Sequence, residues 1–192
     1  MKNILIFGDS NTWGFDAATY DPQLGTVKRM GWEERWPGRV QMLLGDGYHI
    51  IENALNARTC MAEDPYFPRR QGLESLQVAL DANAPLDLVV LKLGCNELKH
   101  MFNLTAGMIA YGLEKLVGEC KTSYYGYPPP QVLVIAPAPT HPAIGEMMFG
   151  FSFGPDAHAK SCELGKHYKE LAKRNGCGFL DCAPLCFELN TV

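Results

Sequence analysis

The segment NILIFGDS, residues 3–10, indicates the class of fold to which this chain belongs. Its first five residues form a short apolar run that stops at Gly8, a pattern typical of a strand buried on both faces of a parallel sheet. The polar pair Asp9 and Ser10 follows at once, so a carboxylate and a hydroxyl stand at the end of this strand. The rest of the chain must then supply further strands and the helices that connect them.

Strand-like and helix-like segments alternate along the whole chain. Apolar runs predict strands at residues 3–7, 48–55, 86–93, 131–135 and 178–181. Apolar residues at helical spacing predict helices at residues 36–44, 73–82, 103–120 and 156–175. Asn103 and Thr105 are both candidate starts for the third helix, and Gly176 ends the fourth. Strands separated by helices require right-handed crossovers, so we predict an α/β fold with five parallel strands and helices on both faces of the sheet.

Composition limits the kind of protein this can be. The chain has 192 residues, of which 47% are hydrophobic, and this suits one domain over residues 1–192. Its 17 basic and 21 acidic residues give a net charge of -4, which disfavours nucleic acid and anionic membranes as main partners. No apolar stretch is long enough to span a bilayer, and the N-terminal apolar run is too short for a signal-peptide core. We therefore expect a cytoplasmic protein.

The seven cysteines do not show the spacing of a disulfide framework. One group near the C-terminus is a candidate for zinc binding, and it consists of Cys162, His167, Cys177, Cys182 and Cys186. This group lacks the Cys-x-x-Cys pair that structural zinc sites usually contain. Because free cysteines behave as small apolar residues, we expect reduced thiols and no bound metal.

The carboxyl ends of the predicted strands are the expected place for an active site, as in other parallel α/β sheets. Four loops meet at this edge of the sheet, at residues 8–34, 55–70, 94–102 and 136–155. The first and the last contain stretches longer than ordinary connections, and long loops in compact domains tend to carry function.

Ser10 is the candidate nucleophile, because a serine after glycine at a strand end can present its hydroxyl to a pocket. The oxyanion that forms when such a serine attacks an ester needs preset hydrogen-bond donors. The backbone N–H groups of Ser10 and Ala57 and the side-chain amide of Asn96 are the candidate donors. Alternatively, Ser10 is only a helix cap, Asn96 is only a turn residue, or the turn binds phosphate, although it lacks the spacing of a P-loop.

Three blocks of sequence lie at the predicted strand ends. They are GDSNTWG at residues 8–14, NART at residues 56–59 with Asp64-Pro65 after it, and GCNE at residues 94–97. In this order they resemble the GDSL, or SGNH, hydrolase family, and the second block resembles its arylesterase and acyltransferase branch. The resemblance extends over about residues 1–188.

This resemblance implies a three-layer, flavodoxin-like α/β sandwich around a parallel five-stranded sheet. It also implies ester hydrolysis or acyl transfer without a metal or an organic cofactor. Ser10 corresponds to the family's nucleophile, and Ser10, Ala57 and Asn96 correspond to its oxyanion donors. The expected substrates are short-chain acyl or aryl esters, with water or an alcohol as acyl acceptor.

The chain departs from the family pattern at three places. Ala57 stands where most members have glycine, and Glu97 stands where most have aspartate. The Asp-x-x-His block, which supplies the catalytic base and its acid, is not found, and we expect it after Val192 in a chain truncated at its C-terminus. Among the five histidines, His141 is the best placed to substitute. Without a base, the alternative is a catalytically inactive domain of the same fold that binds a ligand or a partner.

The remaining candidates concern substrate binding. They are Asn11, Trp13, Phe15, Asn56, Phe149 and Phe153. The apolar segment MMFGFSF, residues 147–153, suits a pocket wall or lid, an oligomer contact, or core beneath a long loop. In the acyltransferase branch such loops build a hydrophobic channel between subunits, so the resemblance implies a homo-oligomer.

Overall fold

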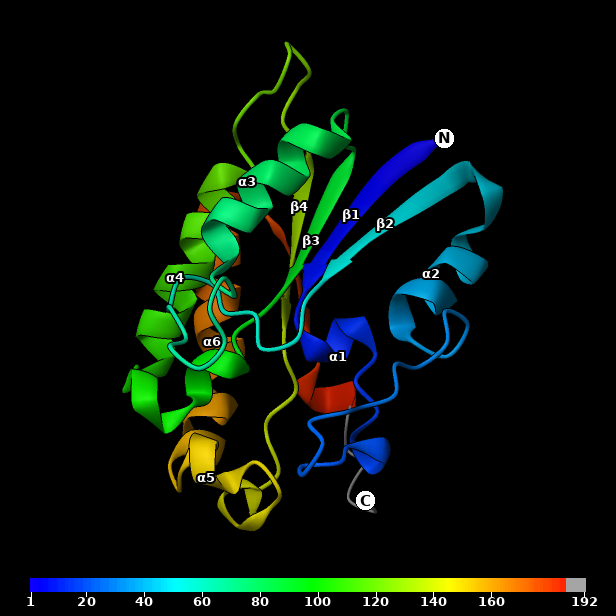
Figure 1. Cartoon of the computed structure of the whole chain (residues 1–192). Coiled ribbons are helices and arrows are strands. Elements are labelled where there is room, and N and C mark those ends of the chain that lie inside the picture. The colour runs from blue at the N-terminus through cyan, green and yellow to red at the C-terminus, as the bar shows by residue number, and fades with distance from the viewer. Residues whose placement is uncertain (186–192) are drawn as a thin grey trace.

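The computed structural model describes residues 1–185 of the chain. Five parallel strands form one sheet in the order β2-β1-β3-β4-β5 (Figure 1). The strands are β1 (Lys2–Gly8), β2 (Tyr48–Ala54), β3 (Leu88–Lys92), β4 (Gln131–Ala136) and β5 (Gly178–Asp181). Each neighbouring pair is parallel, so the predicted parallel five-stranded sheet is confirmed.

Four longer helices cover this sheet. They are α2 (Trp36–Leu44), α3 (Gly72–Asn83), α4 (Ala106–Glu119) and α6 (Ala157–Asn175). Helices α3, α4 and α6 lie on one face of the sheet, and α2 lies on the other (Figure 1). The three-layer α/β sandwich expected from the sequence is therefore confirmed.

Alternate side chains of the central strands point into two separate apolar clusters. In β1, Leu5 and Phe7 belong to the larger cluster, under α3, α4 and α6, whereas Ile4 and Ile6 belong to a smaller cluster with Trp36 of α2. Successive residues of a strand face opposite sides of the sheet. Because both sides of β1 are apolar, its sequence reads as a continuous apolar run rather than an alternating one.

Of the two starts that the sequence offers for α4, Asn103 and Thr105, the structure confirms Thr105, so the helix is shorter than the predicted range 103–120. Thr105 is the N-cap residue, and its hydroxyl accepts a hydrogen bond from the backbone N–H of Met108 at 3.2 Å. Asn103 has a φ of 47°, a left-handed conformation that no helical residue adopts. The strand β3 is also shorter than predicted, because its pairing with β1 covers only Leu88 to Lys92.

Two short helices have no counterpart in the sequence prediction. They are α1 (Ser10–Trp13) and α5 (Gly150–Phe153). Each has four residues, too few for apolar periodicity to reveal a helix. Single turns of 3-10 helix lie at Ala17–Thr19, Gly45–Gly47, Asn96–Leu98, His100–Phe102, Ile144–Glu146 and Ala183–Leu185.

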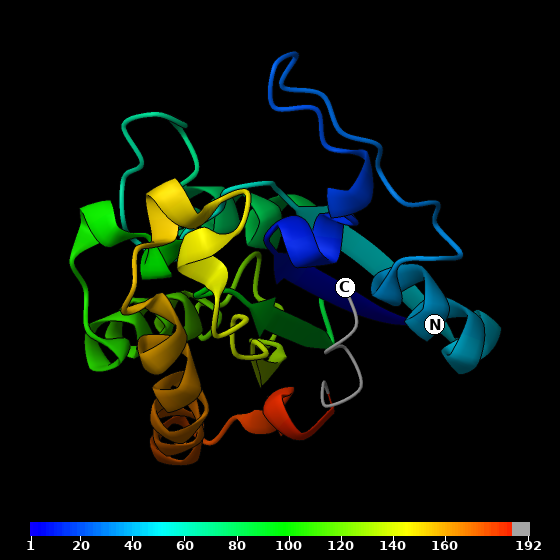
Figure 2. The same cartoon turned by 90° about the horizontal axis from the view of Figure 1, so that it is seen from below.

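The strand order reverses direction at β1, which has β2 on one side and β3 on the other. Gly8, the last residue of β1, is in register with Ala54 of β2 and Lys92 of β3, so the three following loops leave the sheet at one level. Ligands of such sheets bind at this reversal, outside the carboxyl ends of the strands. Figure 2 views the molecule from this end, with α1 and α5 in front.

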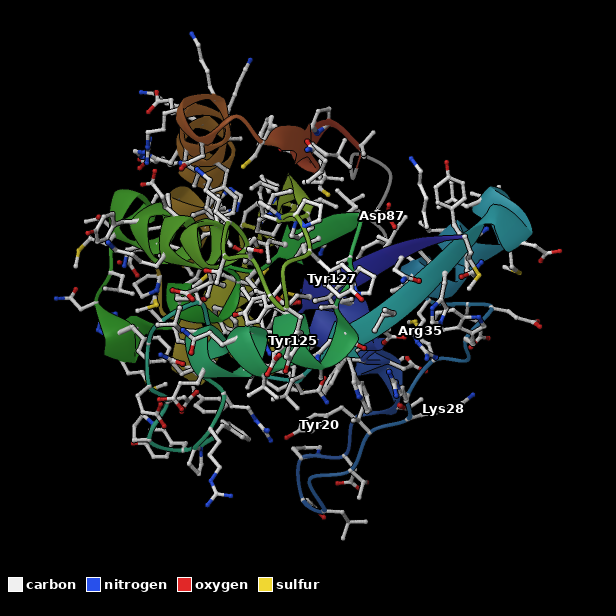
Figure 3. All side chains as sticks on the ribbon, turned by 90° about the horizontal axis from the view of Figure 1, so that it is seen from above. Tyr20, Lys28, Arg35, Asp87, Tyr125 and Tyr127 are labelled. Atoms are coloured by element: carbon white, nitrogen blue, oxygen red, sulfur yellow. The ribbon has the colours of Figure 1, made fainter. Side chains whose placement is uncertain are left out.

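The opposite end of the sheet carries the loops that precede β3 and β4. Figure 3 views that end and labels Asp87, Tyr125 and Tyr127 on these loops. Within residues 1–185, no helix combines the length and the apolar character that crossing a membrane requires. The same residues do not bring three or more His, Cys, Asp or Glu side chains together in a group able to hold a metal ion, and Cys186 lies outside the described residues.

Candidate active site

Ser10 is the first residue of α1, directly after the end of β1. The N-cap residue of this helix is Asp9, whose side chain accepts a hydrogen bond from the backbone N–H of Asn11. The alternative in which Ser10 is only a helix cap is therefore wrong. Gly8 leaves the space for this turn, because a Cβ atom there would lie 2.2 Å from Oγ1 of Thr12.

Asp9 is buried and braces the turn that carries Ser10. Its Oδ1 accepts hydrogen bonds from the backbone N–H of Asn11 at 3.0 Å and from the side-chain amide of Asn11 at 3.2 Å. Burial raises the pKa of the Asp9 carboxyl, and the nearby Lys92 ammonium partly offsets this effect. The amide of Asn11 also lies 3.7 Å from Sγ of Cys95, so it links the turn to the loop after β3.

Ala57 has a φ of 61°, in the left-handed region that favours glycine. This conformation explains the glycine of the family pattern, and alanine adopts it at a cost of about 1–2 kcal/mol. Among the described residues, none accepts a hydrogen bond from the backbone N–H of Ala57 or of Ser10. Both groups are thus available as donors. The neighbouring Asn56 is half-buried, and its Oδ1 has no partner within residues 1–185.

Asn96 is buried in the loop that follows β3. Its Nδ2 donates a hydrogen bond to the carbonyl oxygen of Arg58 at 3.0 Å. A primary amide carries two N–H groups, so the second can serve an oxyanion. Gly94 permits the turn before Asn96, because it has a φ of 117° and a Cβ atom there would lie 2.1 Å from the hydroxyl oxygen of Tyr168.

Arg58 joins the loop after β2 to the end of β1. It belongs to the block NART at residues 56–59, but the sequence alone indicated no role for it. Its Nη1 donates to the carbonyl oxygens of Gly8 at 3.1 Å and Asn53 at 2.6 Å, and its Nη2 donates to Oδ1 of Asn53 at 2.9 Å. The guanidinium carbon lies 3.9 Å from the centroid of the Phe7 ring. Burial lowers the pKa of Arg58 to about 10, and the Asp9 carboxylate opposes this shift. The side chain therefore stays charged at neutral pH.

Two acidic residues hold the loop after β3 against the loop after β2. Oε1 of Glu97 accepts a hydrogen bond from the backbone N–H of Cys60, and burial raises the pKa of Glu97 to about 7. Asp64 is buried and pairs with Lys99 at 2.8 Å. Burial alone would raise the pKa of Asp64, but Lys99 and two backbone N–H groups together lower it below its ordinary value. The Glu97 that replaces the family's aspartate thus has a defined structural contact.

Three aromatic residues from two long loops meet beside the turn that carries Ser10, the candidate nucleophile. We call this turn the nucleophile turn, and we call Phe15, Tyr20 and Phe149 the aromatic rim. Their ring centroids lie 5.2 to 6.0 Å apart. The rim is next to Ser10 because the backbone N–H of Phe15 donates to the carbonyl oxygen of Ser10 at 3.1 Å. Phe153, another candidate for substrate binding, instead packs against the main apolar cluster. Tyr20 escaped prediction because only folding brings it next to Phe149.

A buried carboxylate fastens the long loop 15–34 to the sheet. Glu52 of β2 pairs with Arg29 at 2.7 Å and with Arg35 at 2.8 Å. Nε of Arg29 also donates to the carbonyl oxygen of Trp13 at 2.8 Å, and its guanidinium lies 4.8 Å from the centroid of the Trp13 ring. Trp13, the last residue of α1, is therefore linked to this loop through Arg29.

All five histidines fall within the described residues, and none of them hydrogen-bonds the Ser10 hydroxyl. His141 is exposed, and its Nδ1 accepts a hydrogen bond from the backbone N–H of Ala143 at 3.1 Å. His158 contacts the carbonyl oxygen of Thr140. The prediction that His141 is the best-placed substitute for a missing base gains no support from these contacts.

A serine and unpaired hydrogen-bond donors at the switch point of a flavodoxin-like sheet are features that a serine ester hydrolase requires. A sequence profile of the GDSL-like lipase/acylhydrolase family matches residues 6–190. The chain therefore belongs to this family, as its three sequence blocks predict.

Solved esterase structures superpose on nearly the whole chain. A carbohydrate acetylesterase from Sinorhizobium meliloti is 39% identical, with a TM-score of 0.86 over 96% of this chain and 85% of that chain. An aryl esterase from M. smegmatis is 35% identical, with the same TM-score and the same coverage. A lipase/acylhydrolase from Enterococcus faecalis shares the fold at 17% identity, with a TM-score of 0.65 over 99% of this chain and 80% of that chain. None of the curated proteins matches the chain.

Proposed function

We propose that this protein cleaves short-chain acyl or aryl esters through an acyl-enzyme on Ser10. The observation that carries the proposal is the set of donors at neighbouring strand ends. The N–H groups of Ser10 and Ala57 have no acceptor among residues 1–185, and the amide of Asn96 has one N–H to spare. An ester carbonyl attacked by Ser10 would develop its negative charge among these three donors.

The reaction proceeds in two acyl-transfer steps. Oγ of Ser10 bonds to the ester carbonyl carbon, and its proton passes to a base and then to the leaving alcohol as the ester C–O bond breaks. Water, or a second alcohol, then attacks the acyl-enzyme, takes the acyl group and returns a proton to Ser10. The described residues supply the nucleophile and the donors for both tetrahedral intermediates.

The aromatic rim supports the proposed substrate class. Phe15 and Phe149, next to the nucleophile turn, offer ring faces to an aryl group or to a short acyl chain. The structural relatives include a carbohydrate acetylesterase and an aryl esterase, and acetate esters of both kinds are therefore the first substrates to try. The proposed substrate-binding residues are Asn11, Trp13, Phe15, Asn56 and Phe149, whereas Phe153 is left out because it packs against the main apolar cluster.

The exposed apolar part of the loop before α6 supports a homo-oligomer. Met147, Met148 and Phe151 are exposed there, next to the aromatic rim. A second copy packed on this segment would cover these side chains and narrow the access to Ser10. A narrower, drier site would favour an alcohol over water as acyl acceptor, which is the basis for proposing acyl transfer beside hydrolysis.

The nucleophile is tested with 4-nitrophenyl acetate and with a serine-directed phosphonate. We expect wild-type protein to release 4-nitrophenol and to gain one phosphonyl group by intact mass, and Ser10→Ala to do neither. Ser123→Ala, which removes an exposed hydroxyl near the other end of the sheet, is the matched control and should behave as wild type. Equal phosphonate labelling of Ser10→Ala and wild type would contradict the proposal.

A further inference from the structure

Arg58 contacts, directly or through its backbone, the segments that carry all three oxyanion donors. We propose that Arg58 is a positioning residue that fixes these donors relative to one another. The inference rests on the proposed function, because it takes Ser10, Ala57 and Asn96 as the donors. It adds a residue whose side chain touches no substrate and acts only through its neighbours.

The first contact fixes the nucleophile turn. Nη1 of Arg58 donates to the carbonyl oxygen of Gly8 at 3.1 Å, two residues before Ser10. The backbone N–H of Leu55 donates to the same oxygen at 3.1 Å. The end of β1 is thereby held from two points on the loop after β2, and the backbone N–H of Ser10 is held with it.

The second set of contacts closes the loop that carries Ala57. The guanidinium donates to the carbonyl oxygen of Asn53 at 2.6 Å and to its side-chain oxygen at 2.9 Å, across five residues of chain. Ala57 lies inside this closed loop with a φ of 61°. A non-glycine residue keeps such a conformation only where its surroundings hold it. The contacts of Arg58 with Asn53 therefore hold the backbone N–H of Ala57 in a fixed orientation.

The third donor is attached to the backbone of the same residue. The carbonyl oxygen of Arg58 accepts one N–H of Asn96 at 3.0 Å, and this bond orients the second N–H. A displacement of Arg58 would therefore turn the Asn96 amide as well as the Ala57 peptide.

The chemistry of the site requires arginine rather than another cation. Three acceptor oxygens lie around one guanidinium, and the planar fork of arginine reaches them together while its face lies on the Phe7 ring. A lysine ammonium is a point charge on a flexible stem and cannot keep the same three directions. Arg58 is also 4% exposed, so it cannot meet substrate from solvent.

The central experiment compares Arg58→Lys with Arg174→Lys on a series of acetate esters. Arg174 is the control, because its guanidinium also donates more than one hydrogen bond, here to the Glu114 carboxylate, and it lies on α6 away from the donors. We expect Arg58→Lys to lower kcat by about 10–100-fold with KM changed by less than about threefold. Arg174→Lys should leave kcat within about threefold. Melting temperatures are measured for both, and rates are normalised to the phosphonate-labelled fraction.

A double-mutant cycle with Asn96→Ala separates positioning from a general loss of stability. If Arg58 acts through the donors, Asn96→Ala should lower kcat by about 100-fold in wild type but by less than about 10-fold in Arg58→Lys. If Arg58 only stabilises the fold, the two effects multiply. The inference would be overturned if the effects of Arg58→Lys and Asn96→Ala on kcat multiply, or if folded Arg58→Lys has an unchanged kcat.

A second variant keeps the test decisive should Arg58→Lys fail to fold. Asn53→Ala removes the acceptor of Nη2 and leaves Arg58 in place, and Asn53→Asp restores an acceptor. We expect kcat to fall by about 10-fold in Asn53→Ala and to recover in Asn53→Asp. Equal kcat values in the two variants would overturn the inference. Loss of labelling in Ser10→Ala together with a normal kcat in the Arg58 and Asn53 variants would leave the proposed function standing and remove only the role of Arg58.

Discussion

The two regions beside Ser10 are built in opposite ways. The donor frame, which comprises Gly8, Arg58, Asn96 and Glu97, is buried and held by polar contacts between the ends of β1, β2 and β3. The aromatic rim sits on two long loops and is held by ring contacts and by the Glu52 ion pairs of one loop. Buried polar contacts are lost at high cost, whereas an aromatic pair contributes only about 0.5–1.5 kcal/mol beyond its burial. The proposed function assigns the frame to the reaction and the rim to the choice of substrate.

Removing a donor from the frame should have the largest effect. We expect Asn96→Ala to lower kcat by about 10²–10³-fold with little change in KM, because the donor acts on the oxyanion rather than on bound substrate. Steady-state kinetics with 4-nitrophenyl acetate measure this. Asn83→Ala is the control, since Asn83 also donates Nδ2 to a backbone carbonyl but lies at the end of α3. A kcat loss of similar size in both variants would contradict the distinction between frame and rim.

A side chain added at Gly94, in the turn before Asn96 of the frame, should lower the free energy of unfolding. Gly94→Ala places a Cβ 2.1 Å from the hydroxyl oxygen of Tyr168 at a φ of 117°, so we expect the free energy of unfolding to fall by about 2–4 kcal/mol. Denaturant unfolding measures it. Gly118→Ala, in α4 with open space around the new Cβ, should be neutral or stabilising by up to about 1 kcal/mol. Equal stability of the two variants would remove the claim that the frame is tightly packed.

The pH dependence of stability tests the buried carboxyl of the frame. The folded protein holds the Glu97 proton with a pKa of about 7, above the ordinary value of 4.5. This stabilising contribution is complete below pH 4.5 and is lost as the pH rises through about 7, which amounts to about 3 kcal/mol at most.

The amide side chain that Glu97→Gln introduces cannot titrate. The melting temperature of this variant should therefore rise relative to that of wild type as the pH increases from 4.5 to 7.5. Asp9, whose pKa is also raised, is present in both proteins and leaves their difference unaffected to first order. Glu163→Gln, at an exposed position of α6, is the control. If the difference in melting temperature between wild type and Glu97→Gln stayed constant across this pH range, the raised pKa of Glu97 would be wrong.

Opening the rim should have the smallest effect, and on a different kinetic parameter. We expect Phe149→Ala to raise KM for aryl esters about threefold to tenfold while kcat stays within about twofold, because the ring binds ground state and transition state alike. Tyr125→Ala is the control, since that aromatic side chain is 77% exposed at the opposite end of the sheet. A fall in kcat without a rise in KM would place Phe149 with the frame instead.

The sequence by itself determined the sheet, the longer helices and the place of the proposed nucleophile. Apolar runs and helical spacing are local patterns, and a strand buried on both faces can hardly be mistaken for a surface segment. Short blocks such as GDSNTWG and GCNE also carry local requirements, because Gly8 and Gly94 are the residues that their turns need. The single turn α1 could not be predicted in this way, because four residues show no periodicity. For α4 the sequence offered both Asn103 and Thr105 as starts, and only the backbone geometry decided for Thr105.

Only the tertiary structure decided how the site is held together. Arg58 and Gly8 are 50 residues apart in the chain, and the register of β1 with β2 brings them into contact. Tyr20 contacts Phe149 for a similar reason: folding brings two loops together, and neither loop's sequence predicts contact with the other. Burial, with a smaller contribution from the Asp9 carboxylate, raises the pKa of Glu97 to about 7. Such contacts depend on how all the strands and helices pack together, and a local pattern in one sequence does not predict that packing.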